Sequence, residues 1–233
     1  MRINKFLAQA GYGSRRKCEE YVLGGLVTIN GEVITDLATQ VQESDKVEIN
    51  QERLKAKQDF SYYKFYKPTG YVCSTNADGG PSIFDLLPLK PGLTYIGRLD
   101  KESEGLLLIS DDGRLTYKLT HPKFKKEKVY LVRTDRSITD GEISRMQSGM
   151  LIDGVMTQRA EVEKLNQRSF EITLTEGRNR QIRKMCRKLG LRVHKLKRIE
   201  VGSIKLEELN PGQYIELNKS EMNIIKQITS NIL

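Results

Sequence analysis

The chain has 233 residues, of which 38% are hydrophobic and 30% charged, and 39 Lys and Arg against 30 Asp and Glu give a formal net charge of +9. This length allows one large domain or two unequal ones, and the charge favours a polyanionic partner such as nucleic acid over a membrane surface. The most apolar run, Leu106–Ile109, is far shorter than the roughly 20 residues of a membrane-spanning helix, and no signal sequence, paired-cysteine pattern or nucleotide-binding glycine loop is present.

The first 50 residues predict a small α/β module. Apolar residues with helical spacing open the chain at Ile3, Phe6, Leu7 and Ala10. Ser14 can cap a second helix, which Gly24-Gly25 ends, and the first turn of this helix is basic, with Arg15, Arg16 and Lys17. Short strands follow on both sides of the turn Asn30-Gly31 and at Val47–Ile49.

The basic first turn of the second helix opposes the helix dipole, which indicates a ligand, although a solvated helix end is the simpler alternative. The segment RINKFLAQAGYGSRRKCEEYVLGGLVTINGEVI resembles the alpha-L RNA-binding module of a small-subunit ribosomal protein and of several RNA-modifying enzymes. The resemblance covers residues 1–50 and implies that Arg15, Arg16 and Lys17 contact RNA phosphates.

Residues 51–60 are polar and aperiodic, which predicts a linker to a larger domain over 61–233. Strands are predicted at Tyr62–Tyr66, Tyr71–Cys73, Thr94–Ile96, Leu106–Ile109, Val129–Val132, Ala160–Leu165 and Phe170–Leu174. Helices are predicted at Pro81–Leu87, Arg114–Leu119, Thr139–Met146, Asn179–Leu189 and Ser220–Ile228. Their irregular alternation indicates the α+β class.

The positive charge is concentrated rather than spread. Residues 178–198 contain ten Lys or Arg and no acidic residue, and smaller clusters lie near the N-terminus and at residues 123–128. One such run is usually a solvated face. Three in one chain favour phosphate binding.

Asp100 is the principal candidate for chemistry. It lies in the segment Gly97–Gly105, directly before the apolar run Leu106–Ile109. Loops held by a rigid scaffold often carry catalytic groups. The alternative from spacing alone is a turn aspartate that bonds its own backbone.

The basic helix at Asn179–Leu189 supplies a second candidate. Asn179 can cap it and Gly190 can end it, and Arg183 lies beside its apolar stripe. Arg183 could be a rim arginine with a buried stem. It could also be a buried partner for a carboxylate, with Asp100 as the candidate.

Three segments, GRLDKESEGLLLISDDG, KVYLV and EGRNRQIRKMCRKLG, are similar to the signatures of pseudouridine synthases of the RsuA-like branch. These enzymes modify ribosomal RNA and often carry the alpha-L module. The similarity runs from Arg2 to about Leu217. It implies a small N-terminal module followed by a mixed, mainly antiparallel sheet with flanking helices and a cleft across its middle.

The resemblance also implies a role for particular residues. Asp100 matches the catalytic aspartate, Tyr130 the tyrosine that stacks on the target uracil, and Arg183 the arginine that pairs with the catalytic carboxylate. Ile182 matches an apolar pocket residue and Arg98 a basic residue beside the active loop. We further expect the basic helix region to bind RNA through Arg178, Arg180, Lys184 and Arg187.

Uridine isomerisation breaks the N1–C1′ bond and joins C5 to C1′, so we expect neither a metal nor a cofactor. Asp100 could act as nucleophile or as base. We expect a cytoplasmic monomer that acts on ribosomal RNA, with the large subunit slightly favoured by the segment Ser74–Pro88. The alternatives are a non-catalytic RNA-binding factor, and a metal-dependent nuclease that uses Asp100, Asp111 and Asp112.

Overall fold

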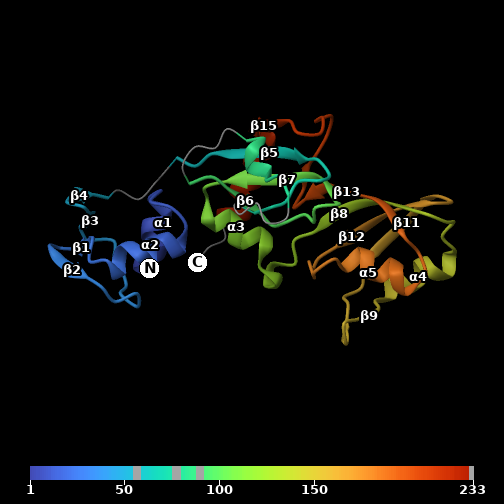
Figure 1. Ribbon diagram of the computed structural model, residues 1–233, viewed down its shortest axis with the longest axis horizontal. Coiled ribbons are helices and arrows are strands. Elements are labelled where there is room, and N and C mark those ends of the chain that lie inside the picture. Colours follow the sequence, from blue (N-terminus) through green and yellow to red (C-terminus); the bar gives the residue numbers. More distant parts are fainter. Residues whose placement is uncertain (55–58, 75–79, 88–91, 231–233) are drawn as a thin grey trace. The chain divides into compact units, whose positions relative to one another are not determined.

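The computed structural model describes residues 1–54, 59–74, 80–87 and 92–230 (Figure 1). It divides into two compact units, the first formed by residues 1–61 with 92–94 and 110–113, the second by most of the rest. The linker predicted at residues 51–60 contains a short strand at Glu52–Arg53, and its residues 55–58 lie outside the described part. Across the described residues, no helix is long and apolar enough to cross a bilayer.

The first unit contains the predicted helices and strands of the N-terminal module. They are α1 (Ile3–Gln9), α2 (Arg15–Leu23), β1 (Val27–Ile29), β2 (Glu32–Ile34) and β3 (Val47–Ile49), and the short strand β4 (Glu52–Arg53), which was not predicted, joins their sheet. The sheet order is β2-β1-β3-β4, with every pair antiparallel. Ile3 and Leu7 of α1 and Cys18 and Val22 of α2 are fully buried in a core of their own, so the apolar stripes read from the sequence face inward.

The second unit is built on one large mixed sheet. Its strands are β5 (Tyr62–Lys67), β6 (Thr94–Ile96), β7 (Glu104–Ser110), β8 (Lys128–Thr134), β11 (Glu161–Asn166), β12 (Ser169–Leu174), β13 (Val193–Val201), β14 (Ile204–Lys205) and β15 (Tyr214–Glu216). The order is β11-β12-β8-β13-β7-β5-β15, with β14 on β13 and β6 on β7. β11 with β12, β12 with β8, β8 with β13, β13 with β14 and β5 with β15 pair antiparallel, whereas β13 pairs parallel with β7, which confirms a mixed, mainly antiparallel sheet.

The register of the central strands places four residues in one row across the sheet. Ile172 on β12 stands opposite Tyr130 on β8, Tyr130 stands opposite Arg198 on β13, and Arg198 stands opposite Gly105 on β7. Neighbours in register point to the same face. Tyr130 and Arg198 are therefore brought side by side, and Arg198 lies opposite Gly105, which follows Asp100 by five residues in the chain.

Helices cover the sheet in two groups. They are α3 (Gly113–Thr120), α4 (Asp140–Ser148), α5 (Gln181–Lys188) and α6 (Lys219–Ser230), with 3-10 turns η1 (Ile83–Asp85) and η2 (Pro122–Phe124) and a hairpin of β9 (Leu151–Ile152) and β10 (Val155–Met156). Helices α4 and α5 pack with β8, β12 and β13 around the fully buried Phe170 (Figure 1). Helices α3 and α6 pack on a second core with β5 and β7. Lys64 of β5 is buried and its Nζ donates to Glu221 of α6 over 2.8 Å.

Three predicted elements differ from the structure. Tyr71–Cys73 makes only one bridge, between Val72 and Ser82, and is not a strand. Pro81–Leu87 contains only the turn η1, because Ser82 caps a single turn and a proline follows Leu87. The basic helix begins at Gln181, not at Asn179, and its N-cap is Arg180.

Candidate active site

A cleft of about 500 Å³ opens in the second unit and is lined by six of the nine site residues predicted in that unit. Its walls come from the loop before β7, from β8, from the connection between β12 and α5, and from β13. The predicted residues that line it are Arg98, Asp100, Tyr130, Arg178, Arg180 and Ile182. Arg183, Lys184 and Arg187 are not among its lining residues.

Asp100 lies in this cleft with its side chain 31% exposed, and its ion pair is with Arg180, whose Nη1 is 3.8 Å from Asp100 Oδ2. Arg180 pairs more closely with Glu102 Oε2, at 2.7 Å. The hydrogen bond between Arg180 and Glu102 raises the pKa of Arg180 and lowers the pKa of Glu102. The guanidinium of Arg180 is thus fixed by Glu102 while it faces Asp100.

The backbone of Arg180 adopts the left-handed conformation, with φ 52° and ψ 32°. A non-glycine residue held there costs about 1 kcal/mol or more. The turn is stabilised by Gln181, whose Oε1 accepts from Arg178 N over 3.2 Å and whose Nε2 donates to Glu176 Oε1 over 2.7 Å. Gln181 is buried, and no pattern in the sequence marks it as part of the site.

Arg183 does not form the direct ion pair with Asp100 that the resemblance implies. Its Nη2 donates to Glu102 O over 2.9 Å and to Ser103 Oγ over 3.3 Å, so it holds the backbone that follows the carboxylate. Burial lowers the pKa of Arg183, and the nearby charge of Arg180 lowers it further. Arg180, the N-cap of α5, pairs with the Asp100 carboxylate in place of Arg183, which lies three residues further along the helix.

Lys67 is a second buried cation behind the Asp100 loop. It is fully buried at the end of β5, and its Nζ donates to Ser103 O over 2.8 Å and to Pro68 O over 2.9 Å. Burial lowers the pKa of Lys67. Gly70 N donates to Lys101 O over 2.8 Å, so the same turn holds the loop a second time.

Arg198 is the third buried cation, with 3% of its surface exposed. Its Nε donates to Leu106 O over 2.8 Å and its Nη1 to Arg98 O over 3.3 Å, so it spans both sides of the loop. Gly105 has φ +108°, and a Cβ at this position would collide with the backbone of Arg198. Only glycine therefore allows β7 and β13 to approach this closely.

Together these contacts fix the backbone on both sides of Asp100. The carbonyls of residues 98, 101, 102 and 103 each accept a hydrogen bond from another segment, and three of the four donors are cationic side chains, of which Lys67 and Arg198 are buried and Arg183 is half-buried. A carboxylate on so constrained a loop is pre-organised. The buried cations also make the cleft attractive to a polyanionic ligand.

Tyr130 is half-buried on β8 and packs against the core that contains Ile182. Ile182 is 4% exposed and lines the cleft from α5. The side chains of Tyr130 and Ile182 therefore give the cleft an aromatic and an aliphatic surface. Such surfaces suit a flat heterocycle.

Two basic residues predicted to bind RNA are engaged with the β9–β10 hairpin. Arg178 donates through its guanidinium to Val155 O and Met156 O, and Lys184 pairs with Asp153 at 2.6 Å. Arg187 is exposed on α5. The basic residues at and before α5 therefore both hold the β9–β10 hairpin, through Arg178 and Lys184, and expose positive charge, through Arg187.

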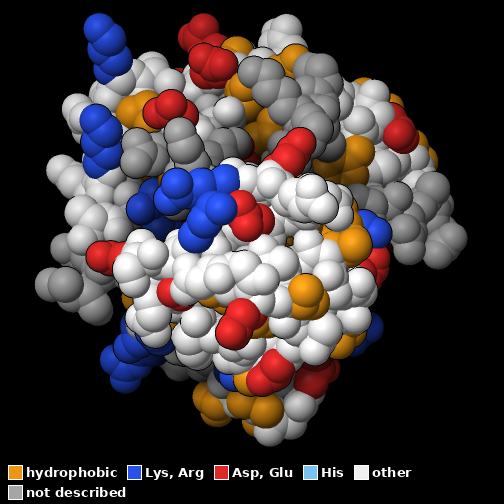
Figure 2. All heavy atoms as spheres, turned by 90° about the vertical axis from the view of Figure 1, so that its left-hand side faces the viewer, with side chains coloured by type: hydrophobic (Ala, Val, Ile, Leu, Met, Phe, Trp, Pro, Cys, Tyr) orange, Lys and Arg blue, Asp and Glu red, His pale blue; other side chains and the backbone are white. Residues whose placement is uncertain are grey.

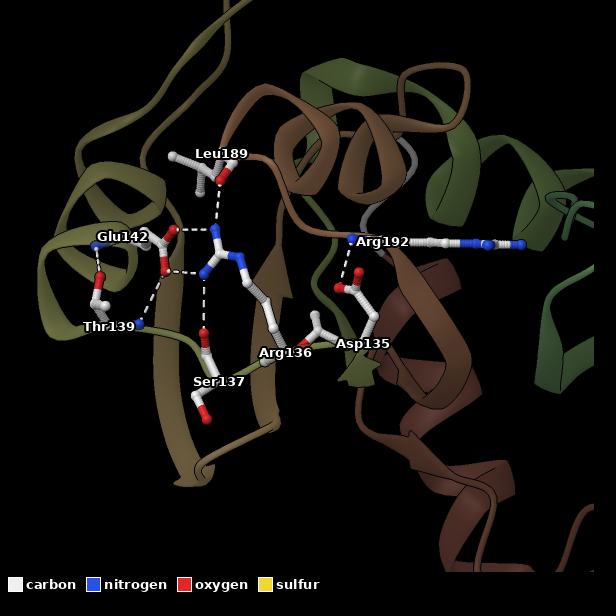
Figure 3. A network of polar contacts seen from close by, with 8 residues as sticks. Asp135, Arg136, Ser137, Thr139, Glu142, Leu189 and Arg192 are labelled. Carbon is white, nitrogen blue, oxygen red and sulfur yellow. Dashed lines mark hydrogen bonds and ion pairs between the residues drawn. The ribbon is translucent and has the colours of Figure 1, made fainter.

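The far end of α5 is anchored by Arg136, as Figure 3 shows. Arg136 Nη2 donates to Leu189 O and pairs with Glu142 Oε1, both at 2.7 Å. Glu142 also belongs to the capping box of α4, and its bond to Arg136 lowers its pKa to about 2. The network joins the end of α5 to the start of α4 and so fixes the helix that carries Arg180 and Arg183.

In the first unit, Arg15, Arg16 and Lys17 are exposed in the first turn of α2, and Ser14 Oγ caps this helix by accepting from Lys17 N. Lys17 also pairs with Glu20 at 2.7 Å.

In the view of Figure 2, several Lys and Arg side chains gather into one compact patch, whereas the Asp and Glu side chains are scattered. The described residues bring no three His, Cys, Asp or Glu side chains together as a metal-binding group.

Comparison with known families assigns both parts of the chain. Residues 61–188 match the family model of RNA pseudouridylate synthase, and residues 1–47 match that of the S4 domain. The first match covers more than half of the chain.

Similar proteins cover nearly the whole chain. Ribosomal large subunit pseudouridine synthase B of Bacillus subtilis (strain 168) is 34% identical over 99% of this chain and 97% of its own length. Dual-specificity RNA pseudouridine synthase RluF of Escherichia coli (strain K12) is 33% identical over 99% of this chain and 80% of its own. A solved structure described as a pseudouridylate synthase superposes with a TM-score of 0.72 at 31% identity, over 97% of this chain and 99% of that one. The chain therefore belongs to the RNA pseudouridylate synthase family, as an RsuA-like member with an N-terminal S4 domain, and it is a pseudouridine synthase.

Proposed function

We propose that this enzyme isomerises a uridine of ribosomal RNA, with the large subunit favoured, and that Asp100 is its single catalytic carboxylate. The observation that carries the proposal is the placement of Asp100 in a cleft, on a loop whose carbonyls are bound by the buried Lys67 and Arg198 and the half-buried Arg183. The names of the Bacillus and Escherichia relatives support an RNA substrate, and the Bacillus name supports the large subunit. We propose that the enzyme works in the cytoplasm as a monomer.

The reaction balances within the substrate. The N1–C1′ bond of uridine breaks, the uracil turns, and a C5–C1′ bond forms while the C5 proton moves to N1. No atom is imported and nothing is oxidised. Asp100 serves either by attacking the nucleoside or by accepting a proton, and both routes need its carboxylate beside the ribose and base.

The target uridine leaves its helix to reach Asp100. Tyr130 provides a stacking surface for the flipped uracil, worth about 1–3 kcal/mol, and Ile182 lies against the same pocket. Arg98, exposed at the cleft, contacts the backbone of the target nucleotide. Arg15, Arg16 and Lys17 bind phosphates elsewhere on the RNA.

The test incubates the protein with transcribed large-subunit and small-subunit rRNA and maps pseudouridine by carbodiimide-dependent stops of reverse transcription. Wild type should create a new stop and Asp100→Asn should abolish it. Asp140→Asn is the matched control, because Asp140 is an exposed residue whose ion pair, with Lys164, lies on the surface.

No stop with wild type, or an equal stop with Asp100→Asn, would overturn the proposal. A non-catalytic RNA-binding factor predicts that Asp100→Asn leaves all effects intact. A nuclease predicts RNA cleavage that EDTA abolishes, whereas pseudouridine formation should be indifferent to the chelator.

A further inference from the structure

An exposed aromatic cluster lies at the end of α3, outside the three hydrophobic cores. The ring centroids of Tyr117 and His121 are 4.9 Å apart, those of Tyr117 and Phe124 are 5.3 Å apart, and those of His121 and Phe124 are 6.2 Å apart. Tyr117 is 44% exposed and His121 is also exposed. We call these three residues the aromatic platform. Phe124 is half-buried, and because none of the three residues belongs to a hydrophobic core, core packing does not account for them.

Lysines surround the aromatic platform. Lys123 Nζ lies 5.1 Å from the ring centroid of Tyr117 and 4.8 Å from that of Phe124. Lys118 Nζ lies 4.5 Å from the ring centroid of Phe124, but Lys118 is buried, so of these two lysines only Lys123 presents its charge at the surface. Residues 123–128 contain four lysines and one acid, so aromatic faces and positive charge occupy the same surface. This combination is typical of surfaces that bind unpaired nucleotides.

The aromatic platform is continuous with the active-site cleft. His121 belongs to both, and its neighbours Thr120 and Pro122 line the cleft together with Lys126 and Lys128. Lys126 and Lys128 also precede Tyr130 on the same stretch of chain. An RNA strand that delivers a uridine to Asp100 can therefore leave the cleft past His121, with its phosphates near these lysines.

We propose that the aromatic platform stacks the base of an unpaired nucleotide next to the target uridine, while Lys123 and Lys126 contact its phosphates. The inference rests on the proposed function and adds a subsite to it. Base stacking is tolerant of sequence. The platform would therefore secure an unpaired neighbour of the target rather than read its identity.

The test uses a short stem-loop of ribosomal RNA with an unpaired uridine in its loop, and it measures binding in the Asp100→Asn background. In that background Tyr117→Leu should raise the Kd by about 5- to 50-fold, whereas Tyr117→Phe should stay within about 2-fold. Tyr214→Leu is the matched control, because Tyr214 is also partly exposed but lies on β15, the last strand in the sheet order. Thermal unfolding of each variant checks that the fold is intact.

A second arm replaces the nucleotides that flank the target, one at a time, with abasic residues. One abasic position should weaken binding with Tyr117 present and have little further effect in Tyr117→Leu. The proposal would be overturned if every abasic position weakened binding equally in the proteins with Tyr117 and with Leu at this position. It would also be overturned if Tyr117→Leu left the Kd unchanged. Pseudouridine formed by wild type on the unmodified stem-loop is scored separately, so its absence would count against the proposed function and not against the subsite.

Discussion

At the scale of single residues, Lys67, Arg183 and Arg198 each donate to a backbone carbonyl of the loop that carries Asp100. The sequence predicted Asp100 and Tyr130 because they lie in recognisable segments, and the structure places both on the cleft. The sequence did not predict a role for Lys67 or Arg198. Their partners are backbone carbonyls, which every residue has, so no pattern of side chains marks the contact.

The two arginines of α5 should differ when replaced. Arg183→Gln should lower kcat by about 100-fold, because it releases the loop after Asp100 and small misplacements of a catalytic group are costly. Arg180→Gln should lower kcat by at most about 10-fold, because its pair with Asp100 is long and partly exposed. Saturating-substrate kinetics on rRNA fragments measures both. A larger loss for Arg180→Gln would show that the ion pair, not the loop backbone, dominates.

At the scale of elements, the amphipathic helices were the best predicted, because their apolar stripes and caps are local. Thr139–Met146 is confirmed as α4, with Thr139 as its N-cap. The start of α5 was wrong by two residues, because Asn179 looks like a cap whereas the buried Gln181 fixes the turn. The nine-residue strand β13 was absent from the predicted strands. Its charged residues obscure the alternation of apolar and polar side chains that marks a strand, because one of them, Arg198, occupies a buried position.

The junction of α4 and α5 should make stability depend on pH in the acidic range. The pKa of Glu142 is lowered to about 2 in the folded protein, chiefly by its bond to Arg136. The unfolded value is about 4.3. The stabilisation is therefore complete above about pH 4.3 and is lost as the pH falls through about 2.

Glu142→Gln should reduce the free energy of unfolding by about 1 kcal/mol at pH 7, the scale of a partly exposed pair with capping bonds. The difference from wild type should shrink between pH 4.3 and pH 2. Urea unfolding at pH 7, 4 and 2.5 measures it, with the exposed Glu163→Gln as control. A difference that does not change with pH would exclude the ionised carboxylate as its origin.

At the scale of the whole molecule, the net charge of +9 is unevenly distributed. Residues 1–50 carry six basic residues against seven acidic ones, a net of −1, so the S4 domain can bind RNA only through local clusters such as the first turn of α2. The segment 178–198 holds ten basic residues, of which Arg198 is buried and Arg178, Arg183, Lys184 and Lys197 are half-buried. Total charge alone predicts a polyanionic partner but not which of these residues remain exposed to it.

RNA binding should therefore weaken with salt, and part of that dependence should belong to the S4 domain. If about six phosphates of looped RNA are neutralised, log K should fall with a slope near −4 against log salt. Arg15→Glu with Arg16→Glu should make the slope shallower by about 1.4, because two phosphate contacts are lost. The control is Arg159→Glu with Arg168→Glu, which removes the same charge at exposed positions of the second unit. Equal slopes for the two double variants would mean that bulk charge, and not the first turn of α2, sets the dependence.

The contact between Gly105 and Arg198 has a consequence for how this enzyme can be altered. Arg198 closes on the backbone of Gly105 and also binds the carbonyls of Arg98 and Leu106, so one residue spans the stretch that contains Asp100. The number of residues in that stretch is therefore fixed, since an insertion or deletion would break at least one of these closures. Redesign of the pocket is confined here to exchanging side chains, and changes of loop length belong in connections that make no such closures.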